Sequence, residues 1–180
     1  MLGPEDQKRL LALARQALEA HVRHQPAPAA DLEPPLDTGC GAFVSIHRGQ
    51  DLRGCLGRLT TDWPVGRVVV HLAEAVSDSD PRFDPVAPQE LDDLQIEISV
   101  LTPERPARPE DVEVGRHGLI IEGGGRRGLL LPQVAVEHGW DARTFLEHTC
   151  LKAGLPPDAW ERDAQLYVFE AQVFSESDFA

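Results

Sequence analysis

The segment from His47 to Arg58 contains the residues whose types and spacing are best suited to chemistry. It holds one thiol, that of Cys55, together with three guanidinium groups and a single opposing carboxylate, Asp51. The three arginines are Arg48, Arg53 and Arg58. Positive charge near a thiol favours the thiolate and lowers the thiol pKa, which a nucleophilic or redox cysteine requires. The segment therefore suggests a reactive Cys55, with Arg53 binding an anionic group.

Two glycines, Gly54 and Gly57, flank this cysteine. Glycine adopts positive φ angles and allows close approach of the backbone, so its N–H groups are available to an anion. A plainer interpretation is that Cys55 fills a tightly packed strand as a small apolar residue while the arginines face water. The residue pattern by itself favours the plainer interpretation, and both stay open as hypotheses.

His117 is a second candidate for chemistry, because it precedes Gly118 at the start of a predicted strand after a long proline-rich loop. An imidazole at the edge of a cleft can act as an acid, a base or a ligand. A solvated loop histidine without such a role is the alternative, and without other information it is the favoured one.

The cysteines indicate neither a disulfide framework nor a structural zinc site. Cys40, Cys55 and Cys150 are odd in number, and no Cys-x-x-Cys or Cys/His pairing at zinc-finger spacing occurs. We predict no metal site, and the sequence does not identify a cofactor.

The formal net charge is −13 at pH 7. Duplex binding depends on lysine and arginine displacing counterions, so this balance opposes a large nucleic-acid interface. Residues 1–90 carry 9 basic and 13 acidic groups, and residues 91–180 carry 8 and 17, so a positive patch is expected in the N-terminal half. No run approaches 18 apolar residues, and the first residues, Met1–Asp6, are acidic where a secretory signal would be basic. We therefore expect a cytoplasmic protein without a membrane span.

Hydrophobic periodicity predicts the elements that must position these residues. Helices are expected over 5–23, from an entry at 62–64 through 76, and over 141–152. Strands are expected in hairpins over 42–59 and 119–131, and singly over 95–101 and 166–174. Pro26–Pro35 carries four prolines and is expected to cross the surface as an extended linker. Two hairpins with irregularly placed helices indicate an α+β fold with a mixed or antiparallel sheet and flanking helices. The linker and the proline-rich loop suggest two lobes that meet at a groove, a frequent ligand site.

The segment Leu52–Gly57, Leu-Arg-Gly-Cys-Leu-Gly, closely resembles the Leu-Arg-Gly-Cys-Ile-Gly signature of the AMMECR domain family. Bacterial and archaeal members of that family are called protein A of the AmmeMemoRadiSam system. Further matching segments follow in order along the chain, and the single departure is Leu56 in place of isoleucine. They are Gly41–Val44, Asp80–Phe83, Leu94–Leu101, Gly115–Leu119, Leu131–Val134 and Lys152–Leu155.

This resemblance implies an α+β domain of two unequal lobes over residues 36–175, with the signature near a cleft between them. Residues 1–35 would be an N-terminal helix and linker, and 176–180 a tail. The resemblance also implies a Memo-like protein and a radical S-adenosylmethionine (SAM) enzyme as partners. The implied catalytic candidates are Cys55 and His117. The implied anion- or substrate-binding residues are Arg53, Gly54, Gly57, Asp80 and Arg82.

Three functions follow as hypotheses. The first is an enzyme or accessory factor that acts on an anionic small molecule or protein group in a radical-SAM-linked modification pathway. The second is a non-catalytic module that docks a Memo-like partner. The third, a nucleic-acid-associated regulator, is least favoured, because of the charge and because a single tyrosine is a poor stacking platform.

Overall fold

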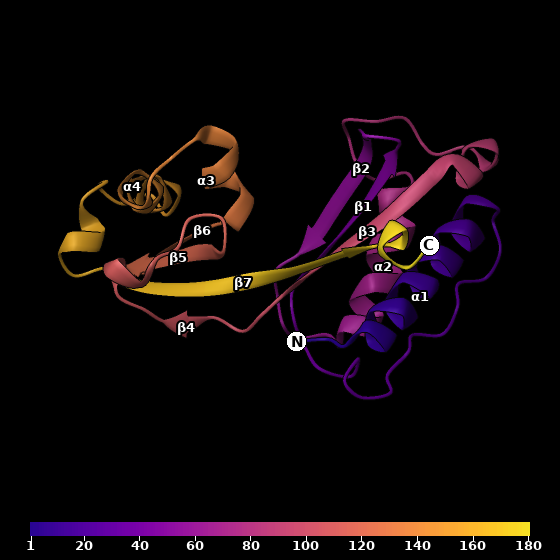
Figure 1. The fold of residues 1–180 in the computed structure, drawn as a ribbon, viewed down its shortest axis with the longest axis horizontal. Helices are drawn as coiled ribbons and strands as arrows, with labels where there is room; N and C mark the ends of the chain where they lie inside the picture. The colour runs from indigo at the N-terminus through magenta and orange to yellow at the C-terminus, as the bar shows by residue number, and fades with distance from the viewer. The chain divides into compact units, whose positions relative to one another are not determined.

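The computed structural model describes residues 1–180 and divides into two compact units. The first unit is Met1–Leu101 with Gln172–Ala180, and the second is Thr102–Ala171 (Figure 1). Helices combine with antiparallel strands in both units, so the predicted α+β class is confirmed. No helix is both long enough and apolar enough to cross a membrane. The boundaries expected at residues 35 and 175 remain a prediction about the extent of the family domain.

The first unit consists of a three-stranded antiparallel sheet and two long helices. Its elements are α1 (Pro4–Val22), β1 (Ala42–Arg48), β2 (Asp51–Arg58), α2 (Val65–Val76), the 3-10 helix η1 (Pro88–Asp93), β3 (Leu94–Leu101) and the 3-10 helix η4 (Glu176–Phe179). The strand order is β2-β1-β3, with β1 in the centre. Both long helices, the first hairpin and β3 confirm the sequence predictions.

The core of the first unit lies between this sheet and the helices. Ala42, Val44 and Ile46 alternate along β1 and are fully buried, because they point toward the helices. α2 packs on β1 and β2, while α1 packs on α2 and β3 (Figure 1). Strand alternation turns the intervening residues to the opposite side of the sheet. We call that opposite side the outer face.

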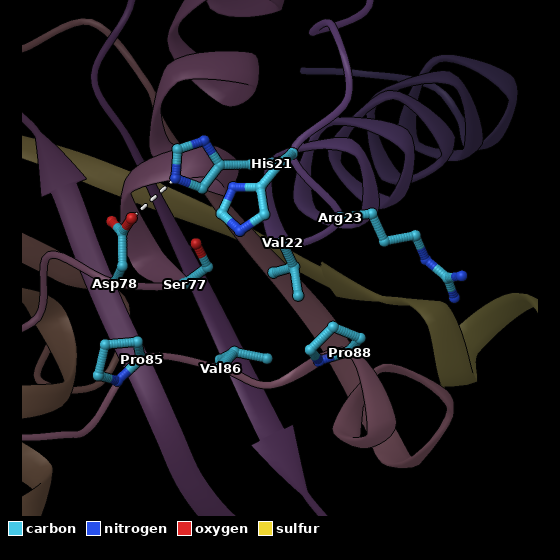
Figure 2. A pocket seen from close by; sticks show the side chains of 9 residues that line it. His21, Val22, Arg23, Ser77, Asp78, Pro85, Val86 and Pro88 are labelled. Atoms are coloured by element: carbon cyan, nitrogen blue, oxygen red, sulfur yellow. Dashed lines mark hydrogen bonds and ion pairs between the residues drawn. The ribbon is translucent and has the colours of Figure 1, made fainter.

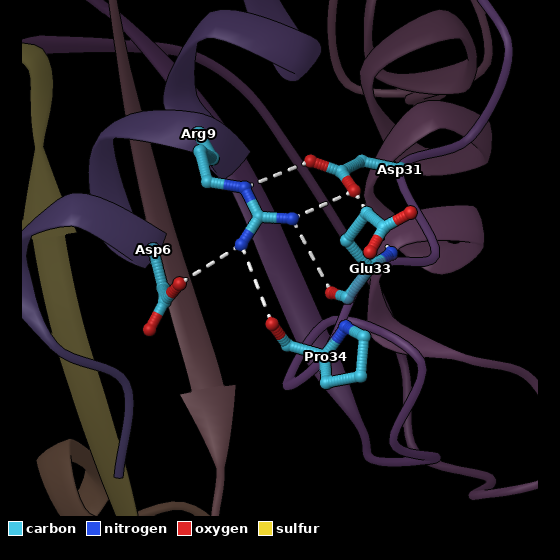
Figure 3. Close-up of polar contacts among 5 residues, drawn as sticks. All are labelled: Asp6, Arg9, Asp31, Glu33 and Pro34. Carbon is cyan, nitrogen blue, oxygen red and sulfur yellow. Dashed lines mark hydrogen bonds and ion pairs between the residues drawn. The ribbon is translucent and has the colours of Figure 1, made fainter.

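The proline-rich linker is fastened to α1 by Arg9, as Figure 3 shows. The Arg9 guanidinium donates to both carboxylate oxygens of Asp31, at 3.0 and 2.8 Å, and to Asp6 at 3.0 Å. Its remaining contacts are to the carbonyl oxygens of Glu33 and Pro34. The hydrogen bonds from Arg9 lower the pKa of Asp31. The linker crosses the surface as expected, and its hydrogen bonds to Arg9 hold it against α1.

The second unit holds a sheet ordered β6-β5-β7-β4 and its own core. Its elements are β4 (Arg105–Pro106), the 3-10 helix η2 (Pro109–Asp111), β5 (His117–Gly123), β6 (Arg126–Leu130), α3 (Pro132–His138), α4 (Ala142–Lys152), the 3-10 helix η3 (Ala159–Glu161) and β7 (Gln165–Ser175), whose last residues belong to the first unit. The second hairpin, α4 and β7 were predicted. Asp141 caps α4 as expected by accepting from the Thr144 N–H at 2.8 Å. The short α3 and β4 were not predicted.

Candidate functional site

Cys55 lies in a row of polar side chains across the outer face of the first unit. Ser45 on β1 is paired in register with Cys55 on β2 and with Glu97 on β3. The Ser45 hydroxyl lies 3.2 Å from Nε2 of His47, two residues further along the same strand face. A thiol, a hydroxyl, a carboxylate and an imidazole thus share one region of the sheet. We call Cys55, Ser45 and Glu97 the Cys55 row.

The main chain of Cys55 is held by an ion pair between the buried Asp80 and the exposed Arg82, which we call the Asp80–Arg82 clamp. The Cys55 N–H donates to Oδ2 of Asp80 at 3.0 Å, and Nη2 of Arg82 lies 3.4 Å from the Cys55 carbonyl oxygen. Arg82 also donates to the carboxylate through its backbone N–H, Nε and Nη2, at 3.1, 3.0 and 2.7 Å. Asp80 is only 3% exposed. The hydrogen bonds from Arg82, followed by those from the Cys55 and Arg82 N–H groups, hold the pKa of this carboxyl far below its usual range despite the opposing effect of burial.

The Cys55 thiol is half-buried and lies outside the hydrophobic core clusters. Burial raises its pKa, and the negative charges of Asp80 and Glu97 act in the same direction. The positive charge of Arg82 opposes this but does not outweigh it. The expectation of a lowered thiol pKa is therefore wrong. The plainer interpretation, that Cys55 fills a tightly packed strand as a small apolar residue, stays open, because the thiol is half-buried.

The arginines of the segment are bound to carboxylates, and none of them is among the groups that act on the pKa of Cys55. Arg53 donates to Glu90 from Nε at 3.0 Å, and Arg48 contacts the same carboxylate at 2.8 Å. These contacts, led by the hydrogen bond from Arg53, lower the pKa of Glu90. Arg58 donates to both oxygens of Asp62 at 3.0 Å. Arg82, which the family resemblance had implied, is the arginine whose charge acts on the thiol.

The two glycines serve packing, and neither has a positive φ angle. A Cβ on Gly54 would lie 3.0 Å from the carbonyl oxygen of Val76, so α2 can approach β2 closely only at glycine. A Cβ on Gly57 would lie 2.3 Å from the ring of Phe43. The expected close approach is present, but it is made by the protein's own groups.

His117 belongs to the second unit and is only 3% exposed. Its Nδ1 accepts a hydrogen bond from the Glu113 N–H at 3.0 Å and so closes the turn before β5. Its Nε2 lies 3.4 Å from Nη2 of Arg105 and 3.8 Å from Oε1 of Glu170. The imidazole is neither exposed nor in a solvated loop, and these contacts favour a structural role.

The sequence did not single out Ser45 and Glu97, and it ranked His47 low. Two strand registers identify them. The β1–β2 register places Ser45 opposite Cys55, and the β1–β3 register places Glu97 opposite Ser45 on its other side. The β1–β3 register pairs Ser45 with Glu97, which lie more than fifty positions apart in the sequence, so no local pattern reveals it.

The first unit also has a cavity of about 460 Å³, lined by the end of α1 and by residues that flank Asp80 and Arg82 in the loop after α2. Figure 2 shows His21 bonded to Asp78 at 2.8 Å beside the apolar side chains of Val22 and Val86. The hydrogen bond from His21 lowers the pKa of Asp78. The remaining lining residues are Arg23, His24, Ser77, Pro85 and Pro88. None of the residues predicted for the functional site lines this cavity.

The fold and the Cys55 row define an α+β protein that presents a clamped cysteine on an antiparallel sheet. The family described as AMMECR1 matches residues 11–174, and the chain belongs to this family. A protein of Thermococcus gammatolerans is 45% identical over 93% of this chain and 88% of its own length. A protein of Methanothermobacter thermautotrophicus is 42% identical, covering 97% of this chain and 96% of its own. The crystal structure of uncharacterized protein PH0010 from Pyrococcus horikoshii is similar with a TM-score of 0.74 at 42% identity, covering 93% of this chain and 90% of that one.

Proposed function

We propose that this AMMECR1-family protein is an enzyme or accessory factor that acts on an anionic group of a small molecule or a protein, with Cys55 as the reacting residue. We place it in a pathway that includes a radical SAM enzyme and a Memo-like protein, as the sequence resemblance implies. The observation that carries the proposal is the Asp80–Arg82 clamp on the main chain of a half-exposed thiol.

Burying the Asp80 carboxylate costs free energy of desolvation, which only pairing and hydrogen bonding offset. Support of a strand alone does not require such a group. Every hydrogen bond that the Asp80 carboxylate accepts comes from Cys55 or Arg82. Its effect is therefore to fix the position of the thiol and to hold one guanidinium beside it. Fixed geometry of this kind supports a functional side chain.

Arg82 is the residue that binds the anionic group in this proposal. Its side chain is 57% exposed, and its Nε and Nη2 face Asp80 while Nη1 makes no hydrogen bond within the protein. Arg53 was the candidate from the sequence. Its side chain is 17% exposed and forms an ion pair with Glu90, so we assign it a structural role in holding β2.

The thiol must lose its proton before it can react, because its raised pKa keeps it neutral at pH 7. As the route for this proton we propose Ser45, which is paired in register with Cys55, and His47, whose Nε2 lies 3.2 Å from the Ser45 hydroxyl. The Cys55 S–H bond breaks as its proton passes to the Ser45 oxygen, and the Ser45 proton passes to Nε2 of His47, which takes up the positive charge. His47 thus replaces His117 as the proposed base.

Alkylation by iodoacetamide, followed residue by residue by mass spectrometry, tests this proposal. We expect Cys55 to react faster than Cys40, which packs against the core, and faster than the fully buried Cys150. Ser45→Ala should slow labelling of Cys55 and leave that of Cys40 unchanged. Equal and slow labelling of all three thiols, or no effect of Ser45→Ala, would contradict the proposal.

A second function, docking of the Memo-like partner without catalysis, is favoured by the 57% exposed side chain of Arg82, which a partner can reach without involving the thiol. In that case Cys55→Ser retains the activity of the pathway in cells, whereas Arg82→Ala loses it. Recovery of the Memo-like protein and the radical SAM enzyme with the tagged wild-type chain, and their loss with Arg82→Ala, would support docking. Recovery of neither by the wild-type chain would count against it.

A further inference from the structure

The edge of β2 has a pattern of paired and unpaired main-chain groups that points to a binding partner. β2 is the terminal strand of its sheet, so only one of its edges faces β1. In an antiparallel pair, alternate residues direct both N–H and C=O away from the neighbouring strand. The Cys55 N–H donates to Asp80 and not to Ser45, so Cys55 is one of these outward residues.

The Asp80–Arg82 clamp closes the edge at Cys55. The carboxylate accepts the outward N–H and the guanidinium lies beside the outward C=O, which are the contacts that a neighbouring strand would make. One residue of the edge is thus already occupied by side chains.

Gly57 lies two residues after Cys55 on β2, and it is paired with Phe43 as Cys55 is paired with Ser45. Because the hydrogen-bond pattern of an antiparallel pair repeats every two residues, Gly57 also directs its N–H and C=O away from β1. Gly57 is exposed. Since glycine has no side chain, this exposure is that of its own main chain. No side chain or loop hydrogen-bonds Gly57. The next residue of the same parity, Leu59, directly follows the end of β2 and is 48% exposed. An exposed strand edge of this kind pairs readily with another chain.

The surroundings of this open edge are positively charged toward solvent. The guanidinium groups of Arg58 and Arg67 lie over the Trp63 ring, at 4.0 and 4.1 Å from its centre. Arg67 forms no salt bridge, and the exposed Arg82 covers a carboxylate that solvent does not reach. The single exposed carboxylate paired in this region is Asp62. With Asp62 and Asp80 counted, these three arginines leave one excess positive charge, that of Arg67, in a chain of net charge −13.

We propose that the edge of β2 from Gly57 to Leu59 binds an extended acidic segment of a partner protein, which adds to the sheet as a further strand. Main-chain hydrogen bonds to Gly57 and Leu59 provide the pairing, and Arg58, Arg67 and Arg82 select carboxylate side chains. A second copy of this chain fits less well, because two bodies of charge −13 repel and each would bring arginines to face arginines. The clamp sets one end of the segment, since no strand can pair beyond Gly57 toward Cys55.

Titration calorimetry with blocked eight-residue peptides of alternating glutamate and valine tests this proposal. The plain peptide is compared with two N-methylated versions, each methylated on the amides of one edge. We expect saturable binding of the plain peptide. One methylated version should retain this affinity and the other should lose at least about tenfold, because only one edge of the peptide faces β2.

Arg67→Ala should weaken binding by about two- to fivefold, and Arg23→Ala, an exposed arginine elsewhere in the first unit, should not. The corresponding lysine–valine peptide should not bind.

Amide exchange in the full chain provides the second readout. We expect the Gly57 amide to exchange rapidly in the free protein and slowly with the glutamate–valine peptide, while the Cys55 amide is slow in both. Absence of saturable binding, equal affinity of the two methylated peptides, or a Gly57 amide that is slow without peptide would overturn the proposal. Protection of Gly57 that grows with protein concentration alone would identify a second copy as the occupant. The result is independent of the proposed reaction, because these measurements do not involve the thiol and are repeated in Cys55→Ser.

Discussion

Replacing Asp80 with asparagine removes the negative charge of the Asp80–Arg82 clamp and almost preserves the shape of the side chain. Asparagine offers one acceptor oxygen where aspartate offers two, and both carboxylate oxygens of Asp80 are used. The amide NH₂ of the new side chain must then face an N–H donor of Cys55 or Arg82. Hydrogen bonds to a charged group contribute about 1.5–3 kcal/mol each, and contacts with the exposed Arg82 side chain are screened by water. We therefore expect Asp80→Asn to lower the free energy of unfolding by about 2 kcal/mol, which in a chain of this length lowers the Tm by about 4–8 °C.

The pH dependence of this difference follows from the lowered pKa of Asp80. A carboxyl whose pKa is lower in the folded state contributes stability that is fully present above its unfolded pKa of about 4 and is lost as the pH falls toward the folded pKa. The gap between the wild-type chain and Asp80→Asn should thus be constant from pH 5 to 7 and narrow below about pH 4. Urea denaturation followed by circular dichroism at pH 7, 5 and 3.5 measures it.

The control for this experiment is Asp84→Asn, which removes a charge from an exposed aspartate in the same loop. We expect it to leave the unfolding midpoint within about 0.5 kcal/mol of the wild-type value. Amide exchange at Cys55 should accelerate in Asp80→Asn and not in the control. Equal behaviour of the two variants would refute the reasoning that the clamp holds β2.

Three other outcomes follow from the structure. Gly57→Ala should destabilise the chain by about 1–3 kcal/mol in urea denaturation, because its Cβ would overlap the Phe43 ring, and Phe43→Leu in the same chain should recover part of that loss. Arg9→Ala should speed proteolytic cleavage within residues 26–35, seen by mass spectrometry of the fragments, while the circular dichroism spectrum stays unchanged. The alkylation rate of Cys55 should rise about tenfold per pH unit from pH 7 to 8, because its pKa is raised, and a plateau near pH 7 would contradict that direction.

The elements that position the site were predictable because their signals are local. The spacing of apolar residues identified α1 and α2, alternation identified β1 and β3, and the turn residues at 48–51 identified β2 as the second arm of a hairpin. α3 was missed because it has seven residues and falls between two stronger signals, and β4 because it has two residues within a proline-rich loop. Both short elements depend on neighbours that are distant in sequence.

The environment of Cys55 was not predictable in the same way. Strand parity already separates Cys55 from Arg58, which points to the other face of β2, so the three arginines of the segment cannot all surround the thiol. What the local pattern does not contain is Glu90, which binds two of those arginines from forty residues away. Nor does it show that the loop after α2 brings Asp80 and Arg82 to the edge of β2; only the family resemblance pointed to these two residues.

The pairing of each arginine with a carboxylate changes how the site can work. An open cluster of guanidinium groups would favour a thiolate, whereas the observed ion pairs leave a neutral thiol whose reactivity depends on removal of a proton. The same ion pairs hold the strand at two points, with Glu90 binding the Arg53 side chain and Asp80 accepting from the Cys55 N–H. The site is therefore positioned before any ligand arrives, by ion pairs of which only Arg82 is also proposed to bind the anionic group. Substitutions that remove this support and those that remove the reacting groups should then separate experimentally: the former lower stability together with thiol reactivity, and Ser45→Ala or Cys55→Ser changes reactivity alone.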